Sequence, residues 1–371
     1  MNITSFRGIH NTLERHDLGA GDLSDALNID VGGRGGDNEQ RILRVRPGYT
    51  KAFDAPLSSS YSTRGGTPYV VSGGQLNKVV TGPSLRAVCP CATDLFCDFD
   101  EVLFTGDWKM LIGESVSDFE VPYPGTQPQV TITGGDREPG LYTCGYTLSN
   151  ADGFQSGLSP VSQVKLDEPG EILVTPPVYP GYAITVYVAP ADGSVFFDES
   201  GTPLAPQNVG TFGLPSDDVV AIEVMDAKLF VASRYSDYSV IRFSKPYHYH
   251  LFDYSNDYIV LPDDVRFIKA VGSTLLIGGA YGIYAYSDGG LVRVADYGVV
   301  NGRSIVIGPD GKGYLHTSRG VCSAMPFTPL TEDRVSLPMG SICSAALMHH
   351  NGIFKYIGLH DNSGLAFNAA F

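Results

Sequence analysis

The sequence predicts an all-β fold, and three observations support this class. Gly occurs 44 times and Pro 24 times in 371 residues, and both residues interrupt helices and favour turns. No window of about twelve or more residues shows the 3.6-residue apolar period of an amphipathic helix. Short apolar runs bounded by Gly, Pro, Asp and Ser recur along the whole chain, as they do in antiparallel sheets.

A hairpin pattern repeats four times towards the C-terminus, and each copy has an apolar run, a short turn and a second apolar run. The turns lie near Lys228, Gly272, Asp310 and Asn351. Their spacing of about 40 to 45 residues is the period of a four-stranded propeller blade. Because one blade cannot bury both of its faces alone, the pattern predicts blades stacked around an axis in a β-propeller. The copies are Val219–Ser233, Val265–Gly279, Arg303–Ser318 and Cys343–Gly358.

The first part of the chain supplies further elements of this propeller. Residues 1–50 form a leader in which Ile42–Val45 alternates like a strand, and we expect this strand to close the ring by pairing with the last blade. Residues 51–121 contain two hairpins, Thr67–Val80 and Asp98–Glu114, which we assign to the first blades. With the copies in residues 216–371 the sequence predicts about six blades.

Residues 122–215 have a different texture. Strand-like stretches of about 5 to 8 residues are separated by Pro, Gly and Asp turns, and Tyr142, Cys144 and Tyr146 alternate with small or polar residues. This alternation is typical of a β-sandwich. We expect an inserted fibronectin-III-like sandwich in which Ala191–Pro215 forms a long return loop.

The chain is acidic, with 40 acidic and 25 basic residues and a formal net charge of −15. Such a surface repels nucleic-acid phosphates, so it argues against tight or sequence-specific DNA binding. Two interpretations of the charge stay open. It serves solubility, or it forms the wall of a conduit through which DNA passes without sticking.

The six cysteines predict free thiols. Cys89, Cys91 and Cys97 resemble half of a zinc site, but no matching Cys/His pair follows at ligand spacing. Cys144, Cys322 and Cys343 lie in apolar, strand-like settings where a reduced Cys is a small core residue. We therefore expect assembly in a reducing cytoplasm.

The N-terminal residues contain no apolar run of signal-peptide length, and no stretch approaches about 18 apolar residues. We expect the chain to begin at or near Met1 and not to span a membrane.

Few side chains are spaced for chemistry. His248 and His250 would share one face of a strand and could start a metal site with Asp253 or Asp257, but no third ligand has a defined offset. We interpret them as part of an aromatic loop, Tyr247–Tyr258, packed at a blade rim or a subunit contact.

Neighbouring acids are interpreted in the same structural way. Asp98 with Asp100, Asp217 with Asp218 and Asp263 with Asp264 stand where strands begin, and Asp is a preferred turn residue. Ser159 lacks the glycines of a nucleophile elbow, and Gly32–Gly36 lacks the Lys of a phosphate loop. The sequence therefore predicts no catalytic residue, no metal site and no cofactor, and the protein is expected not to be an enzyme.

Candidate interface residues come from two segments, because Tyr and Arg are enriched in interface cores. Arg41, Arg44 and Arg46 cluster in the leader. They either face an acidic partner surface or pair with the acids of Asp22–Asp37. The second segment supplies four tyrosines: Tyr247, Tyr249, Tyr254 and Tyr258.

The leader resembles a family of phage virion proteins. In that family a GI-N segment, an AxNxDV segment and an RPGY segment precede a β-propeller. Here they correspond to Gly8–Asn11, Leu18 with Gly21, Asp25–Val31 and Arg44–Tyr49. The later stretches Leu229–Ala232, Ile241–Ser244 with Pro246 and Phe252, Tyr258–Pro262, Gly282–Tyr286 and Leu141–Ser162 are similar to the propeller and the fibronectin-like module of the same group.

The family is the tail nozzle, or tail tubular protein B type, of short-tailed phages. The resemblance implies a structural virion protein of the tail that forms a homo-oligomeric ring, usually a hexamer, below a tail adaptor protein. Tail fibres are further expected partners, and DNA would leave through the lumen without specific binding.

Two other functions stay open at this point. The chain could be a tail-tip or receptor-binding module that grips a host glycan or pilus, since Tyr-rich loops stack on sugars. It could also be a carbohydrate-active propeller enzyme, which would need convergent acids in the central channel.

Overall fold

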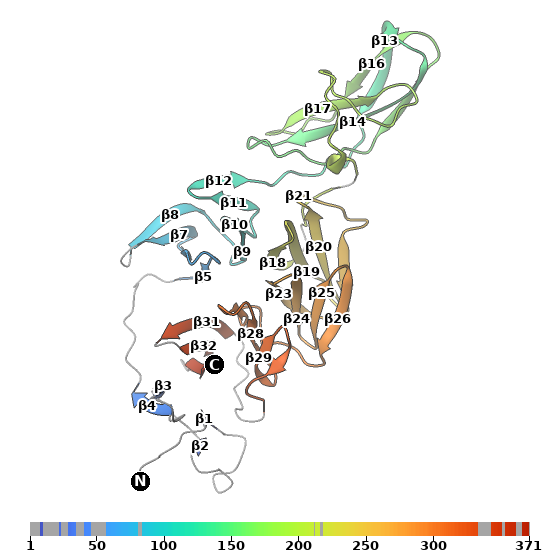
Figure 1. The fold of residues 1–371 in the computed structure, drawn as a ribbon. Coiled ribbons are helices and arrows are strands. Elements are labelled where there is room, and N and C mark those ends of the chain that lie inside the picture. The colour runs from blue at the N-terminus through green and yellow to red at the C-terminus, as the bar shows by residue number, and fades with distance from the viewer. Residues whose placement is uncertain are drawn as a thin grey trace. The chain divides into compact units, whose positions relative to one another are not determined.

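The computed structural model describes residues 57–80, 84–210, 212–215 and 218–332, together with the backbone of short strands near both termini and a few side chains of the last sheet. The described part is all-β (Figure 1), and its one helix is a single 3-10 turn at Pro206–Asn208. The all-β prediction is confirmed. The chain forms two compact units, one of residues 55–262 and one of residues 1–54 with 263–371.

The unit of residues 55–262 contains three antiparallel sheets that follow one another along the chain, each built as a meander. In each sheet the strands pair in sequence order, apart from β22, which returns to pair with β20. The first two sheets comprise β5 (Ser59–Ser62), β6 (Pro68–Ser72), β7 (Gln75–Val80) and β8 (Ser84–Pro90), then β9 (Phe96–Phe99), β10 (Val102–Thr105), β11 (Lys109–Ile112) and β12 (Ser115–Asp118). The third comprises β18 (Val219–Met225), β19 (Lys228–Arg234), β20 (Ser239–Lys245), β21 (His248–Phe252) and β22 (Tyr258–Leu261).

Two-residue turns with positive φ join several of these strands. Gly73 and Gly74 connect β6 to β7 with φ of 59° and 74°, and Asp226 and Ala227 connect β18 to β19 with φ of 52° and 57°. Two consecutive positive φ values match the right-handed twist of the flanking strands, which is why such turns dominate tight hairpins. The predicted turns at Gly73–Gly74 and near Lys228 are therefore where the structure has them.

Neighbouring sheets of this unit share hydrophobic cores. Leu76 of the first sheet packs in one cluster with Leu103 and Leu111 of the second. Phe104 of the second sheet packs in another cluster with Val224 of the third. The first strands β9 and β18 also lie next to each other. Consecutive meanders thus pack face to face, and two of their first strands meet.

Two further sheets are inserted between β12 and β18. β13 (Gln129–Arg137) pairs with β16 (Gly170–Thr175), and β14 (Gly140–Ser149) lies between β15 (Ser162–Leu166) and β17 (Ala183–Ala189). The two sheets share a core that includes Tyr142, Cys144 and Ile172. Tyr142, Cys144 and Tyr146 are all buried, but burial does not alternate strictly along the strand, because Gly145 and Thr147 are buried as well. The predicted return loop Ala191–Pro215 contains isolated β-bridges at Phe197 and the 3-10 turn.

The other unit contains the remaining meanders. β23 (Val265–Val271), β24 (Thr274–Gly279), β25 (Ile283–Ser287) and β26 (Gly290–Ala295) form one sheet, and β27 (Val306–Ile307), β28 (Gly313–Thr317), β29 (Gly320–Ala324) and β30 (Thr328–Pro329) form the next. They share a core of Phe267, Leu276 and Leu315. Every residue of β24 is buried, whereas the first four residues of the outer strand β26 are exposed.

The strands near the termini also belong to this unit. β31 (Cys343–His350), β32 (Ile353–His360) and β33 (Ala366–Ala370) form a three-stranded sheet, and β27 lies beside β31. In the leader β1 (Gly8–Ile9) pairs with β2 (Asp22–Leu23), and β3 (Ile29–Arg34) pairs with β4 (Arg41–Val45). Among the described pairings β4 pairs with β3 rather than with the last sheet, so ring closure by the leader stays a prediction.

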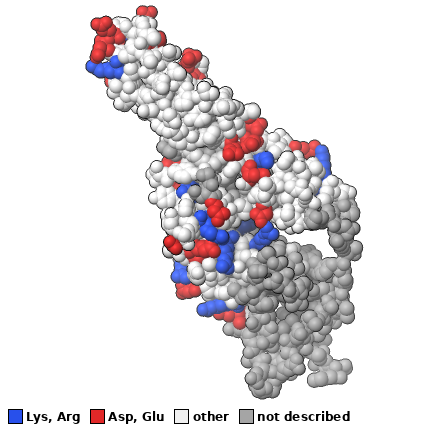
Figure 2. Space-filling model, turned by 180° about the vertical axis from the view of Figure 1, so that it is seen from behind, with Lys and Arg blue, Asp and Glu red and all other residues white. Residues whose placement is uncertain are grey.

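Charges of both signs are interspersed on the surface. Over the described part of the face in Figure 2, acidic and basic side chains stand in small mixed groups. Exposed ion pairs of the described residues include Arg86 with Glu114 and Arg137 with Glu171. Within the described residues no helix is long and apolar enough to cross a membrane.

Candidate functional site

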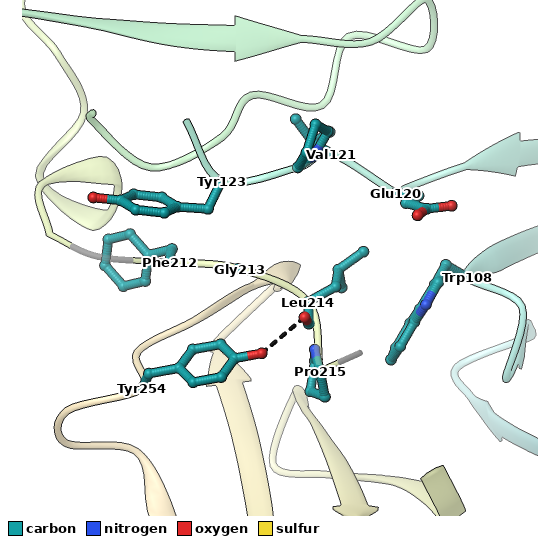
Figure 3. A pocket seen from close by; sticks show the side chains of 10 residues that line it. Trp108, Glu120, Val121, Tyr123, Phe212, Gly213, Leu214, Pro215 and Tyr254 are labelled. Atoms are coloured by element: carbon teal, nitrogen blue, oxygen red, sulfur yellow. Dashed lines mark hydrogen bonds between the residues drawn. The ribbon is translucent and has the colours of Figure 1, made fainter. Parts of the chain in front are cut away.

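A cavity of about 500 Å³ lies in the unit of residues 55–262, where the chain runs into and out of the inserted sheets. Four aromatic rings line it: Trp108, Tyr123, Phe212 and Tyr254. Figure 3 shows Tyr123 and Phe212 on one side and Trp108 on the opposite side. The other lining residues are Glu120, Val121, Pro122, Gly213, Leu214 and Pro215.

Local backbone structure sets the position of Trp108. The residue has a φ of 59° in the turn between β10 and β11, and its N–H donates to the Thr105 carbonyl at 3.1 Å. Its own carbonyl accepts the Phe119 N–H at 3.0 Å, and the two rings meet edge to face with centroids 6.0 Å apart. Because Phe119 is fully buried, the indole is anchored on a fixed partner.

Tyr254 and Phe212 are held by contacts behind the cavity. The Tyr254 hydroxyl donates to the Leu214 carbonyl at 2.8 Å (Figure 3). The guanidinium of Arg242 stands 4.6 Å from the centre of the Tyr254 ring, and the ammonium of Lys245 stands 5.6 Å from the centre of the Phe212 ring. Both distances lie within the range of cation–π attraction.

The charge of the lining has one sign. Glu120 is the one acidic side chain among the ten described lining residues, it is exposed, and none of the ten is a Lys or Arg. The remaining lining is apolar or aromatic. The cavity therefore combines electron-rich ring faces with a solvent-accessible carboxylate.

A second group of polar side chains lies where first strands approach one another. The Tyr61 hydroxyl of β5 donates to Asp98 Oδ1 of β9 at 2.5 Å, and the Arg64 N–H donates to Asp98 Oδ2 at 2.9 Å. The Arg64 guanidinium donates to Glu223 Oε1 of β18 at 2.8 Å. These four residues, which we call the first-strand network, connect three sheets.

Burial makes the first-strand network electrostatically strong. Asp98 is 4% exposed and Glu223 is 1% exposed, while the Arg64 side chain is 47% exposed. Burial, followed by the charges of Glu223 and Asp98, raises the pKa of Tyr61 far above its usual value, so this residue stays a hydroxyl donor. A carbohydrate-active enzyme would need convergent acids, and here two acids converge. Each of them accepts from a protein donor, which is the arrangement of a structural cross-link.

The four predicted interface tyrosines have different environments. Tyr247 is 75% exposed in the turn before β21, and Tyr258 is 45% exposed on β22. Tyr249 is half-buried and its ring meets Phe104 at 4.7 Å, and burial raises its pKa. Tyr254 lines the cavity. The structure therefore brings only Tyr254 to this site and leaves Tyr247 and Tyr258 at the surface.

The predicted arginines fall where little is described. The backbone of β4 includes Arg41 and Arg44, which lie opposite Arg34 and Asp30 of β3. Their side chains and the whole of Arg46 lie outside the described residues. Their role as interface residues stays a prediction.

His250 is an internal partner of the inserted sheets. Its Nε2 stands 2.9 Å from the Gln155 carbonyl, and its ring meets Phe154 edge to face at 5.2 Å. The ring is 6.3 Å from that of His248. Asp253 and Asp257 bind Lys245 instead, at 3.5 Å and 2.6 Å. Within the part of the chain that the structure describes, no three His, Cys, Asp or Glu side chains are grouped to hold a metal ion.

Members of two other acid pairs and five cysteines also have structural roles, whereas Asp217 lies outside the described residues. Asp263 is buried, its Oδ1 accepting the Tyr281 N–H at 3.1 Å and its Oδ2 the Tyr284 hydroxyl at 3.2 Å. Asp100 sits in the β9–β10 turn with a φ of 48°. Cys89, Cys91, Cys97, Cys144 and Cys322 are buried free thiols.

Sequence reasoning did not find the cavity, and it gave Asp98 a turn role without partners. The one signal for the cavity is the lone tryptophan of the chain, placed in a turn between strands. The partners in the first-strand network are up to 159 positions apart, so local patterns do not reveal them.

The comparisons with known proteins give a weak likeness. A scan against protein-family models finds no matching family, and a search of curated proteins finds no match. Solved structures that resemble the chain are β-propeller proteins. One is the Dos1 propeller, at 10% identity over 85% of this chain and 92% of that chain, with a TM-score of 0.33. Another is virginiamycin B lyase from Staphylococcus aureus, at 10% identity over 82% and 92%, with a TM-score of 0.32.

A third is the extracellular domain of the putative hybrid two-component system BT4673 from B. thetaiotaomicron, at 12% identity and a TM-score of 0.34. The match covers 83% of this chain and 37% of that one, so this chain spans well under half of its length. At these TM-scores the likeness carries no argument about fold or function. The architecture given above rests on strand pairing and shared cores.

Proposed function

We propose that this protein is a structural component of a short-tailed phage tail, a β-propeller of about six blades that assembles into an oligomeric nozzle ring. In this proposal the meanders are the blades, and the two inserted sheets are a fibronectin-III-like module. The ring is a homo-oligomer, in the family of the resemblance usually a hexamer. It joins the tail adaptor, carries tail fibres as further partners, and passes DNA without specific binding during ejection.

The observation that carries the proposal is the packing of consecutive meanders. Within each unit neighbouring sheets share a core, and first strands approach one another at β9 with β18 and at β27 with β31. Sheets that pack in this manner support a stiff scaffold. The first-strand network adds cross-links between three sheets and leaves its two acids engaged with protein donors, which favours a scaffold over an enzyme.

The leader supports the virion role independently. Its Gly8–Asn11, Asp25–Val31 and Arg44–Tyr49 segments resemble the opening of tail nozzle proteins. Mixed surface charges (Figure 2) and a net charge of −15 are compatible with a lumen that does not retain DNA.

Electron microscopy and light scattering of the purified protein test assembly. We expect closed rings at high protein concentration and the same protein in purified phage particles. Because Tyr247 and Tyr258 are exposed, Tyr247→Ser with Tyr258→Ser should weaken assembly and leave the free energy of unfolding unchanged. Tyr281→Ser, at a 73% exposed tyrosine outside the predicted interface, is the control. A strictly monomeric protein that is absent from particles would contradict the proposal.

A second candidate, a tail-tip or receptor-binding module, is favoured by the inserted sheets. They expose the apolar side chains Ile132, Leu173 and Val178, which a binding partner would cover. Specific binding of the isolated chain to host cells or to a glycan array would favour this function over the nozzle.

A further inference from the structure

The proposed scaffold function does not account for the aromatic cavity. Its volume of about 500 Å³ lies in the range of small-ligand sites. Its rings come from a turn of the second sheet, the two crossings to the inserted sheets, and the segment after β21. Scaffold packing alone does not require four rings from separate segments to line an open space.

The chemistry of the lining selects a class of ligand. The faces of aromatic rings are negative and attract cations, and Trp is the strongest of them. Glu120 adds a full negative charge, and no base among the ten described lining residues opposes it. A saccharide would need many hydrogen-bond partners, whereas this lining is mostly apolar.

The chain already uses two of these rings to bind cations. Arg242 stands over Tyr254 and Lys245 over Phe212, and neither Arg242 nor Lys245 lines the cavity. Among the described residues Trp108 and Tyr123 hold no cation of the chain. These two rings and Glu120 are therefore the groups available to a ligand.

We propose that the cavity binds a methylated ammonium group, which is attracted by the aromatic rings of the lining and neutralised by the Glu120 carboxylate. The methyl groups suit an apolar, aromatic lining, and the positive charge suits the rings and the carboxylate.

The natural reporter is Trp108, the single tryptophan of the chain, because its fluorescence arises at the cavity itself. We expect a saturable fluorescence change when tetramethylammonium or choline is added to the full-length protein. 3,3-Dimethylbutan-1-ol, which has the shape of choline without its charge, should give none at the same concentrations. An equal response to the neutral alcohol would overturn the proposal, and so would no saturable response by fluorescence and calorimetry.

Variants test two of the three available groups, Glu120 and Tyr123, by calorimetry. Glu120→Gln removes the charge of an exposed residue and should weaken choline binding about threefold to fivefold, the upper part of the range for an exposed ion pair. Glu168→Gln, at an exposed acid of the inserted sheets, is the matched control and should leave the affinity unchanged. Tyr123→Leu should weaken binding about fivefold, whereas Tyr123→Phe keeps the ring and should bind normally.

Unchanged affinity in Glu120→Gln would overturn the role of the carboxylate, even if Tyr123→Leu fails to fold. A panel of neutral oligosaccharides forms the last arm. Saturable binding of a saccharide with none of tetramethylammonium would overturn the proposal and favour the glycan-binding candidate.

Discussion

At the scale of single residues, the molecule places several ionisable groups in its interior and holds each with a specific partner. Glu223 and Asp98 bind Arg64 and Tyr61, and His250 binds a backbone carbonyl. Burying such groups costs free energy unless their partners are in place. The same cost makes their contributions to stability large enough to measure.

His250 should make stability fall in mild acid. Burial lowers its pKa to about 4 from an ordinary value of 6.5. Between these two pH values the unfolded state binds a proton that the folded state does not bind. The contribution of His250 to the free energy of unfolding is constant above about pH 6.5. As the pH falls from there to about 4, the free energy of unfolding decreases by about 3 kcal/mol at most. Urea unfolding at pH 7 and pH 4.5 measures this. His250→Gln should show a smaller pH dependence than wild type, whereas an unchanged dependence would contradict the assignment.

Loss of Arg64 should destabilise the protein more than loss of a surface arginine. Arg64→Met removes the guanidinium that donates to the buried Glu223 carboxylate, while the backbone N–H that donates to Asp98 stays in place. We expect a loss of about 1 to 3 kcal/mol, less than for a fully buried pair because Arg64 is partly exposed. Arg86→Met breaks an exposed pair with Glu114 and should cost under about 1 kcal/mol. Equal losses in guanidinium unfolding would argue against a cross-linking network.

At the scale of elements, the connection after β26 passes so close to the connection between β24 and β25 that a side chain would not fit between them. A Cβ on Gly298 would stand 1.9 Å from the Ala280 carbonyl oxygen, whereas the nearest neighbour of a Cβ on Gly313 would be 3.4 Å away. Gly298→Ala should therefore cost about 3 kcal/mol or more, and Gly313→Ala less than about 1 kcal/mol. Thermal unfolding of the two variants checks this order, and the reverse order would disprove the close approach.

Elements were also the scale at which the sequence was most informative. The burial of Tyr142, Cys144 and Tyr146 and the turn at Gly73–Gly74 depend on residues close together in the chain, so periodicity and turn chemistry predict them. The cavity and the first-strand network depend on which sheets become neighbours. Arg64 and Glu223 lie 159 positions apart, and no local pattern pairs them.

At the scale of the whole molecule, its thiols report on global opening. Burial raises the pKa of Cys89, Cys91 and Cys322, and raises that of Cys144 to about 11. Because only the thiolate reacts, these cysteines should resist Ellman's reagent at pH 8 in the native protein and react rapidly in denaturant. The experiment uses the Cys343→Ser variant, so that labelling reports only on the five cysteines known to be buried. Fast labelling of the native Cys343→Ser variant would show that the cores open readily.

The burial gradient across the sheet of β23–β26 has a consequence for variation among related chains. β24 is buried along its full length while most of β26 faces solvent. Substitutions should therefore accumulate on β26 and be rare on β24. The exposed strand is then free to acquire new binding specificities without loss of stability. A saturation library scored for expression would display this as tolerance that rises from β24 to β26.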